Sequence, residues 1–166
     1  MKGDDIAERL LSFAAAVLKL TREMPMDAAG KHVSRQMIRA ATGGGSNYEE
    51  ARGAESRADF IHKVSVAAKE MREALYWLKL VRKAELSPRR SVDGLIGEVN
   101  ELVAILSSST KTATGTGATT PCNTSRAREL DWRAATTSSI GTNIREIRSS
   151  LRAVGHRSSS TTIRST

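Results

Sequence analysis

Apolar side chains recur every three or four positions along four separate stretches of this chain. The first stripe comprises Ile6, Leu10, Phe13, Val17, Leu20 and Met24. The others are Val33, Met37 and Ala40–Ala41; then Phe60, Val64, Ala67, Met71, Ala74 or Leu75, Leu78 and Val81; then Leu95, Val99, Leu102 and Leu106, supported by Ile96, Val103 and Ile105. This spacing places each stripe on one face of an α-helix. Four such helices with short connections predict an all-α, antiparallel up-down four-helix bundle.

Residues that favour helix ends mark the expected boundaries. The expected starts are Asp4 with Asp5, Asp27, the capping box of Ser56 and Asp59, and Ser87 followed by Pro88. Pro25 is expected to end the first helix, because proline cannot donate the backbone hydrogen bond that a helix interior needs. The fourth helix is expected to fray at residues 107–110, which read Ser-Ser-Ser-Thr.

The three consecutive glycines Gly43–Gly45 interrupt the second helical pattern. Glycine costs about 1 kcal/mol relative to alanine in a helix interior, so the segment weakens the helix by roughly 2–3 kcal/mol. Either the helix breaks and restarts with Ser46 or Asn47 as a new cap, or packing holds one kinked helix. The kinked helix, running to about Arg52, is the prediction, because small residues also let a neighbouring helix approach closely.

Composition changes after residue 111. Residues 112–121 are low in complexity, and the remainder is rich in Ser, Thr and Arg. We therefore predict a bundle at residues 1–111 and a disordered or weakly helical tail at residues 112–166. The formal charge of the 166 residues is +8, but residues 1–111 hold 18 Lys+Arg and 15 Asp+Glu, and the tail holds 8 and 3. The bundle is thus nearly balanced in charge.

Two groups of basic residues are candidate phosphate contacts. Lys31, Arg35 and Arg39 lie four apart and form one stripe on the second helix. The second group, around the turn between the third and fourth helices, is Lys79, Arg82, Lys83, Arg89 and Arg90. Either group could neutralise phosphates and give salt-dependent binding, or could be an ordinary solvated face. Tyr48, Tyr76 and Trp77 could stack on bases or pack within the protein.

Asn47 and Glu50 lie three positions apart and therefore share a helix face. Together with Glu73 they predict a polar network inside the bundle or at a subunit interface, with ligand binding as the alternative. A di-metal site is not predicted, because the Glu-x-x-His motif that such bundles use does not occur. Gly43–Ser46 also lacks the Gly-Lys-Ser/Thr sequence of a phosphate-binding loop.

Catalytic and cofactor signals are weak. Arg57 and His62 match a loose Arg-x4-His ribonuclease pattern, but five residues on a helix turn the two side chains about 140° apart. Cys122 is the single cysteine, which excludes an intrachain disulfide or a cysteine-based zinc site. No apolar run is long enough to span a bilayer. We expect no metal, no cofactor, no membrane association, no small-molecule substrate and a cytoplasmic location.

Several motifs from the second to the fourth helix carry a resemblance to a known family. They are Arg35-Gln36, RAAT at residues 39–42, NYEEA at 47–51, SRADF at 56–60, Lys63, EALYWL at 73–78, EVNELVAIL at 98–106 and Lys111. Over about residues 5–113 the chain resembles the bacterial 23S rRNA intervening-sequence protein family. It departs from the family at Gly43–Gly45, where the family has a serine, an apolar residue and a glycine or proline.

The resemblance implies a bundle that assembles into a ring-like homopentamer and has no established enzymatic activity. It also implies a nucleic-acid-binding role, with RNA or DNA as partner. We therefore predict a non-enzymatic, homo-oligomeric accessory protein that binds nucleic acid. The alternative is a structural or protein-interaction bundle, and a remote alternative is the Arg-x4-His ribonuclease.

Overall fold

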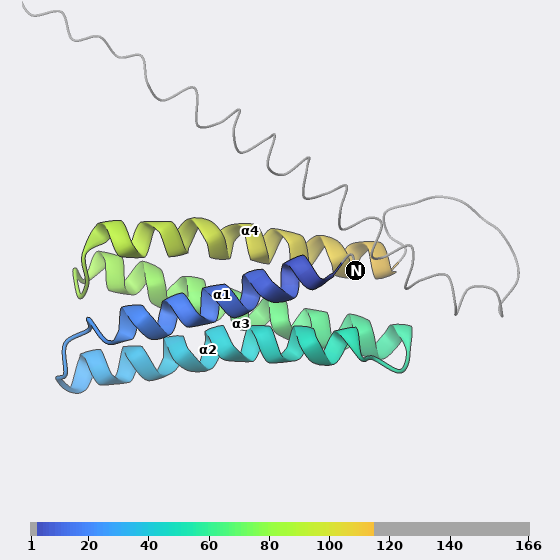
Figure 1. Ribbon diagram of the computed structural model, residues 1–166, viewed down its shortest axis with the longest axis horizontal. Helices are drawn as coiled ribbons and strands as arrows, with labels where there is room; N and C mark the ends of the chain where they lie inside the picture. Colours follow the sequence, from blue (N-terminus) through green and yellow to red (C-terminus); the bar gives the residue numbers. More distant parts are fainter. Residues whose placement is uncertain (1–2, 115–166) are drawn as a thin grey trace, which may run out of the picture.

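A computed structural model describes residues 3–114 of the chain. It contains four α-helices, α1 (Asp4–Thr21), α2 (Ala28–Arg52), α3 (Arg57–Lys83) and α4 (Arg89–Thr114). Successive helices run in opposite directions, and three short connections join them (Figure 1). The antiparallel up-down bundle is therefore confirmed. Most of the predicted tail, including the weakly helical stretch, lies outside the described residues.

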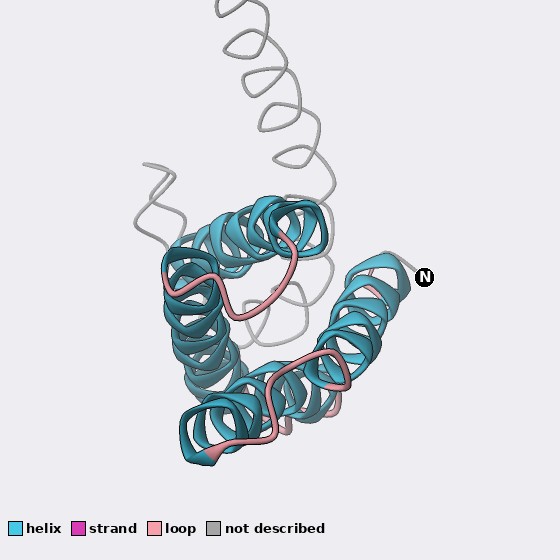
Figure 2. Ribbon diagram, turned by 90° about the vertical axis from the view of Figure 1, so that its left-hand side faces the viewer, coloured by secondary structure: helices cyan, strands magenta, loops and turns pink. Residues whose placement is uncertain are grey.

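The helices form a ring of neighbours in which α1 contacts α2 and α4, and α3 contacts α2 and α4. Figure 2 shows this arrangement along the bundle, with α1, whose start is marked N, beside α2 and separated from α4. Among these four pairs, contact between α2 and α3 is the most extensive, and contact between α1 and α4 is the least. No helix within residues 3–114 has the length and apolar character required to cross a membrane.

The core consists of the predicted apolar stripes. Its largest fully buried side chains include Ile6, Leu10 and Phe13 of α1, Met37 of α2, Met71 and Leu78 of α3, and Leu102 and Leu106 of α4. Two neighbouring positions differ from the expectation for α4, since Ile96 is buried and Leu95 is only partly buried. Adjacent apolar residues leave the rotation of a helix ambiguous, and here the rotation favours Ile96.

Two of the expected capping residues make their bonds. Asp27 Oδ1 accepts a hydrogen bond from the backbone N–H of Gly30 at 2.7 Å, and Ser56 Oγ accepts one from Asp59 at 3.2 Å. The expected cap of α1 is wrong, because Gly3 occupies that position without a side-chain bond. Asp4 lies in the first turn instead and forms an ion pair with Arg52 of α2.

Both predictions for the ends of α4 are wrong. The helix begins at Arg89, and Ser87 Oγ is buried without a hydrogen-bond partner among the described residues. At the other end α4 continues through the Ser-Ser-Ser-Thr segment to Thr114. Ser107 Oγ and Ser109 Oγ donate to the carbonyls of the residues four positions earlier, at 2.6 and 2.9 Å. These hydroxyls can remain in a helix because the helix itself supplies their acceptors.

The glycine segment does not break α2, which runs without interruption from Ala28 to Arg52. Gly44 is buried against α3, where a Cβ atom would overlap the Sδ atom of Met71. The side chain of Asn47 does not begin a new helix, because its Nδ2 donates to the carbonyl of Gly43 within α2 at 2.8 Å. Close packing on α3 thus offsets part of the helix-propensity cost of the glycines.

Candidate nucleic-acid interface

The two basic groups lie at the same end of the bundle. Arg39 Nη2 contacts Glu73 Oε1 at 2.5 Å, which shows the antiparallel register of α2 against α3. Residues before Arg39 on α2 therefore lie beside residues after Glu73 on α3. This places Lys31 and Arg35 level with the last two turns of α3. The start of α2 and the α3–α4 connection lie at the same end of the bundle (Figure 1).

Most of these basic side chains are available to a partner. Lys31, Arg35, Lys79, Lys83 and Arg90 are exposed and form no ion pair within residues 3–114. All five side chains belong to the basic residue types and point charge-bearing groups toward solvent. Their common location concentrates positive charge where a phosphate backbone could approach.

Two further arginines of the predicted group form exposed ion pairs at the α3–α4 connection. Arg82 Nη1 contacts Asp93 Oδ1 at 3.3 Å, and Arg89 Nη2 contacts Glu85 Oε1 at 2.8 Å. The side chains of the second pair are 72% and 69% exposed. Exposed pairs of this kind contribute about 0–1 kcal/mol, so a phosphate can replace the carboxylate at low cost.

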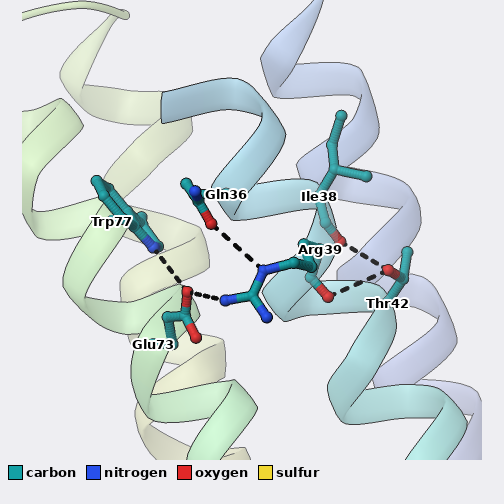
Figure 3. A network of polar contacts seen from close by, with 6 residues as sticks. All are labelled: Gln36, Ile38, Arg39, Thr42, Glu73 and Trp77. Carbon is teal, nitrogen blue, oxygen red and sulfur yellow. Dashed lines mark hydrogen bonds and ion pairs between the residues drawn. The ribbon is translucent and has the colours of Figure 1, made fainter. Parts of the chain in front are cut away.

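Arg39 has a different role, because it is held in a polar network between α2 and α3 (Figure 3). Its Nε donates to Gln36 Oε1 at 3.3 Å, and its Nη2 contacts Glu73. Glu73 Oε1 also accepts a hydrogen bond from Trp77 Nε1 at 3.3 Å. Arg39 therefore neutralises Glu73 and anchors two helices, and it contributes less free charge than Lys31 and Arg35.

Three aromatic rings lie next to this network. The ring centroid of Trp77 is 5.7 Å from that of His32 and 5.1 Å from that of Tyr76, both in edge-to-face geometry. Tyr76 is 60% exposed, His32 is exposed and Trp77 is partly buried. Tyr48, which was predicted together with Tyr76 and Trp77 either to stack on bases or to pack within the protein, is buried in the other half of the bundle. Burial raises the pKa of Tyr48 to about 12.

The residues of the predicted polar network do not meet one another within the described chain. Asn47 bonds to its own helix, Glu50 forms an ion pair with Lys63 of α3, and Glu73 pairs with Arg39. The hydrogen bond to Glu50 raises the pKa of Lys63. Glu50 and Glu73 thus each join α2 to α3, whereas Asn47 stabilises α2 alone. Their part in a subunit interface stays a prediction.

Arg57 of the ribonuclease pattern forms a hydrogen bond with the end of α4. Its Nε donates to the carbonyl oxygen of Ala113 at 2.5 Å, while His62 is exposed on α3. This bond satisfies a carbonyl that has no partner within its own helix, which is a structural use of the guanidinium. Within residues 3–114, no group of three or more His, Cys, Asp and Glu side chains is placed to hold a metal ion.

Sequence reasoning missed three residues of the basic end. Lys19 and Arg22 are exposed near the end of α1, and His32 joins the aromatic rings. The signal was available, because the connection from α1 to α2 is short and must place the end of one helix beside the start of the next. Glu23 and Asp27 lie in the same connection, and Asp27 is used as the cap of α2.

Comparison with known proteins places this arrangement in a family. The chain has no match among curated proteins. It is similar to the crystal structure of a protein of unknown function from the S23 ribosomal protein family of Bacteroides thetaiotaomicron. The two chains are 33% identical with a TM-score of 0.60, over 64% of this chain and 99% of the other. Residues 4–108 match the model of the 23S rRNA-intervening sequence protein family. Because this match covers the whole bundle except its last residues, the chain belongs to the 23S rRNA-intervening sequence protein family.

Proposed function

We propose that this protein is a non-enzymatic, cytoplasmic accessory protein that binds nucleic acid through the basic end of its bundle. The observation that carries the proposal is the convergence of two basic groups that lie far apart in the sequence. Lys31 and Arg35 of α2 are brought level with Lys79 and Lys83 of α3 and with Arg90 of α4. Lysine and arginine side chains that neutralise phosphates release counterions, so the binding should weaken steeply as salt is raised.

A titration of the full chain with a structured RNA and a duplex DNA, at two salt concentrations, tests the proposal by fluorescence anisotropy. Binding that is tight at low salt and weak at high salt is expected. Absence of binding at low salt would sink the nucleic-acid role and leave the structural or protein-interaction bundle as the better explanation.

A matched pair of substitutions on α3 locates the interface. Lys83→Ala and Lys69→Ala each remove one exposed charge from the same helix, but only Lys83 lies at the basic end. Lys83→Ala should weaken binding and reduce the slope of log affinity against log salt by about 1. Lys69→Ala should leave both values unchanged. Equal effects would mean that the phosphates do not contact this end.

We also propose that the bundle acts as a homo-oligomer, with five copies as the number that the family resemblance implies. The outer face of α1 supports this proposal, because Leu11 and Leu18 are 65% and 41% exposed. Leu11 also lines a groove of about 540 Å³ between α1 and α2. Exposed apolar surface of this kind is commonly covered by a partner. Light scattering on the purified chain gives the mass, and a strictly monomeric mass would exclude the ring.

A further inference from the structure

Tyr76, Trp77 and His32, hereafter the aromatic cluster, lie among the free cations of the basic end. Tyr76 is one of four large hydrophobic side chains that are exposed within the described residues. The other three are Leu11, Leu18 and Met26, which lie outside α3. An exposed tyrosine ring contributes little to the stability of the bundle, since its apolar surface stays in water. Tyr76 therefore offers an accessible ring to a partner, and the packing of the bundle does not depend on that ring.

The cluster is fixed in place before any partner arrives. Trp77 contacts both other rings edge to face, and its Nε1 donates to Glu73. Arg39 neutralises Glu73, so the one carboxylate that holds the cluster repels phosphate only weakly (Figure 3). A ring that is already ordered loses little conformational freedom when a flat ligand stacks on it.

Cations continue from the cluster along the same helix faces. Lys79 and Lys83 follow Tyr76 by three and seven positions on α3, and these spacings return to the same side of a helix. They correspond to distances of about 4.5 and 10.5 Å along the helix axis. On α2, Lys31 and Arg35 flank His32. One surface thus combines an accessible ring with positive charges on either side.

We infer that this surface binds single-stranded nucleic acid, with an unpaired base stacked on Tyr76 and adjacent phosphates on Lys79 and Lys83. This inference rests on the proposed function and names its substrate class. Proteins that bind single strands combine cationic grooves with aromatic rings on which bases stack. In a duplex the base faces are already stacked on one another, so only its phosphates could use this surface. A single-stranded loop of a folded RNA presents the same chemistry.

The test compares two 12-nucleotide DNA probes with equal phosphate number, oligothymidine and an abasic strand of the same length. The full chain carries Trp132→Phe, so that the fluorescence of Trp77 reports on the cluster. Oligothymidine should bind roughly 5- to 100-fold more tightly than the abasic strand and should quench Trp77. Tyr76→Ala should remove this preference without changing the affinity for the abasic strand, and Tyr76→Phe should retain it. Lys83→Ala should weaken both probes alike.

The outcomes separate this inference from the function on which it rests. Equal affinity for the two probes overturns base stacking and leaves phosphate binding intact. Absence of binding to both probes at low salt overturns the proposed function as well. If Tyr76→Ala lowers the oligomeric mass and leaves the base preference unchanged, the cluster is a contact between copies and the inference is wrong.

Discussion

Gly30 and Gly97 show how differently two helical glycines can be used. A Cβ atom at Gly30 would overlap the carbonyl oxygen of Pro25 in the connection before α2. A Cβ atom at Gly97 of α4 would have no neighbouring atom within 4 Å. The first glycine allows two backbone segments to meet, whereas the second serves no packing purpose in the described chain.

Alanine substitutions at these two positions should therefore change stability in opposite directions. Gly30→Ala should lower the free energy of unfolding by about 1–3 kcal/mol, because the backbone carbonyl of Pro25 must move. Gly97→Ala should raise it by about 0.5–1 kcal/mol through helix propensity. Urea unfolding followed by circular dichroism measures both. A neutral Gly30→Ala variant would show that the connection before α2 shifts freely.

The burial of the Tyr48 hydroxyl predicts that the protein loses stability at alkaline pH. Burial raises its folded-state pKa to about 12, above the ordinary value of 10.0. The unfolded chain therefore releases this proton first, and stability should fall as pH rises from about 10 to 12. A shift of two units corresponds to about 2–3 kcal/mol. Unfolding of the wild-type chain and of Tyr48→Phe, measured across this range, gives the contribution by difference. Tyr76→Phe is the control, because it leaves Tyr48 in place, and a fall of equal size in Tyr48→Phe would contradict the assignment.

At the scale of helices, Arg9 is the main polar link between α1 and α4. Its Nε and Nη2 atoms contact Glu98 and Glu101 at 2.7 and 2.8 Å. The hydrogen bond to Glu98, aided by that to Glu101, raises the pKa of Arg9 above its ordinary value. The Arg9 side chain is 19% exposed, so water screens these contacts less than it screens a fully exposed pair.

Arg9→Ala should lower the unfolding free energy by about 1–2 kcal/mol, because it leaves two partly buried carboxylates without their partner. Arg89→Ala is the matched control, since it breaks a pair whose members are both more than two thirds exposed. It should change stability by less than about 0.5 kcal/mol. Thermal unfolding at low and high salt compares the two variants, and equal losses would show that the Arg9 contacts are no stronger than a surface pair.

The inward faces of the helices could be predicted because their apolar residues are periodic, and two starts could be predicted because Asp27 and Ser56 cap through local bonds. The burial of Ile96 in place of Leu95 could not be predicted, because neighbouring apolar residues fit two rotations of one helix equally well. The bond from Arg57 to Ala113 could not either, because it joins residues 56 positions apart. The two basic groups could be found separately, but their shared location depends on the antiparallel register of α2 and α3, which the Arg39–Glu73 contact marks.

At the scale of the whole bundle, residues 3–114, charge is distributed unevenly between the two ends. The connection between α3 and α4 is flanked by Lys83, Arg89 and Arg90. At the other end, Glu49 and Glu50 come near the end of α2, and Glu55 lies in the connection to α3. A phosphate backbone should therefore approach the bundle in one orientation.

This asymmetry predicts which backbone amides respond to a nucleic acid. In NMR spectra at low salt, an added oligonucleotide should shift the amides of residues 79–91 and 28–36, and should leave those of residues 50–57 in place. Raising the salt concentration should reverse the shifts. Equal responses at both ends would indicate association without a preferred orientation.

The limited contact of α1 with α4 predicts an order in which the helices of the bundle open. Helices α2, α3 and α4 share the most extensive packing, and α1 rests mainly on α2. The free energy needed to release α1 alone is therefore smaller than that needed to separate the other three. Backbone amides of α1 should exchange with deuterium at a lower opening energy than those of α3. Exchange of this kind would mean that α1 detaches and rebinds while α2, α3 and α4 stay packed.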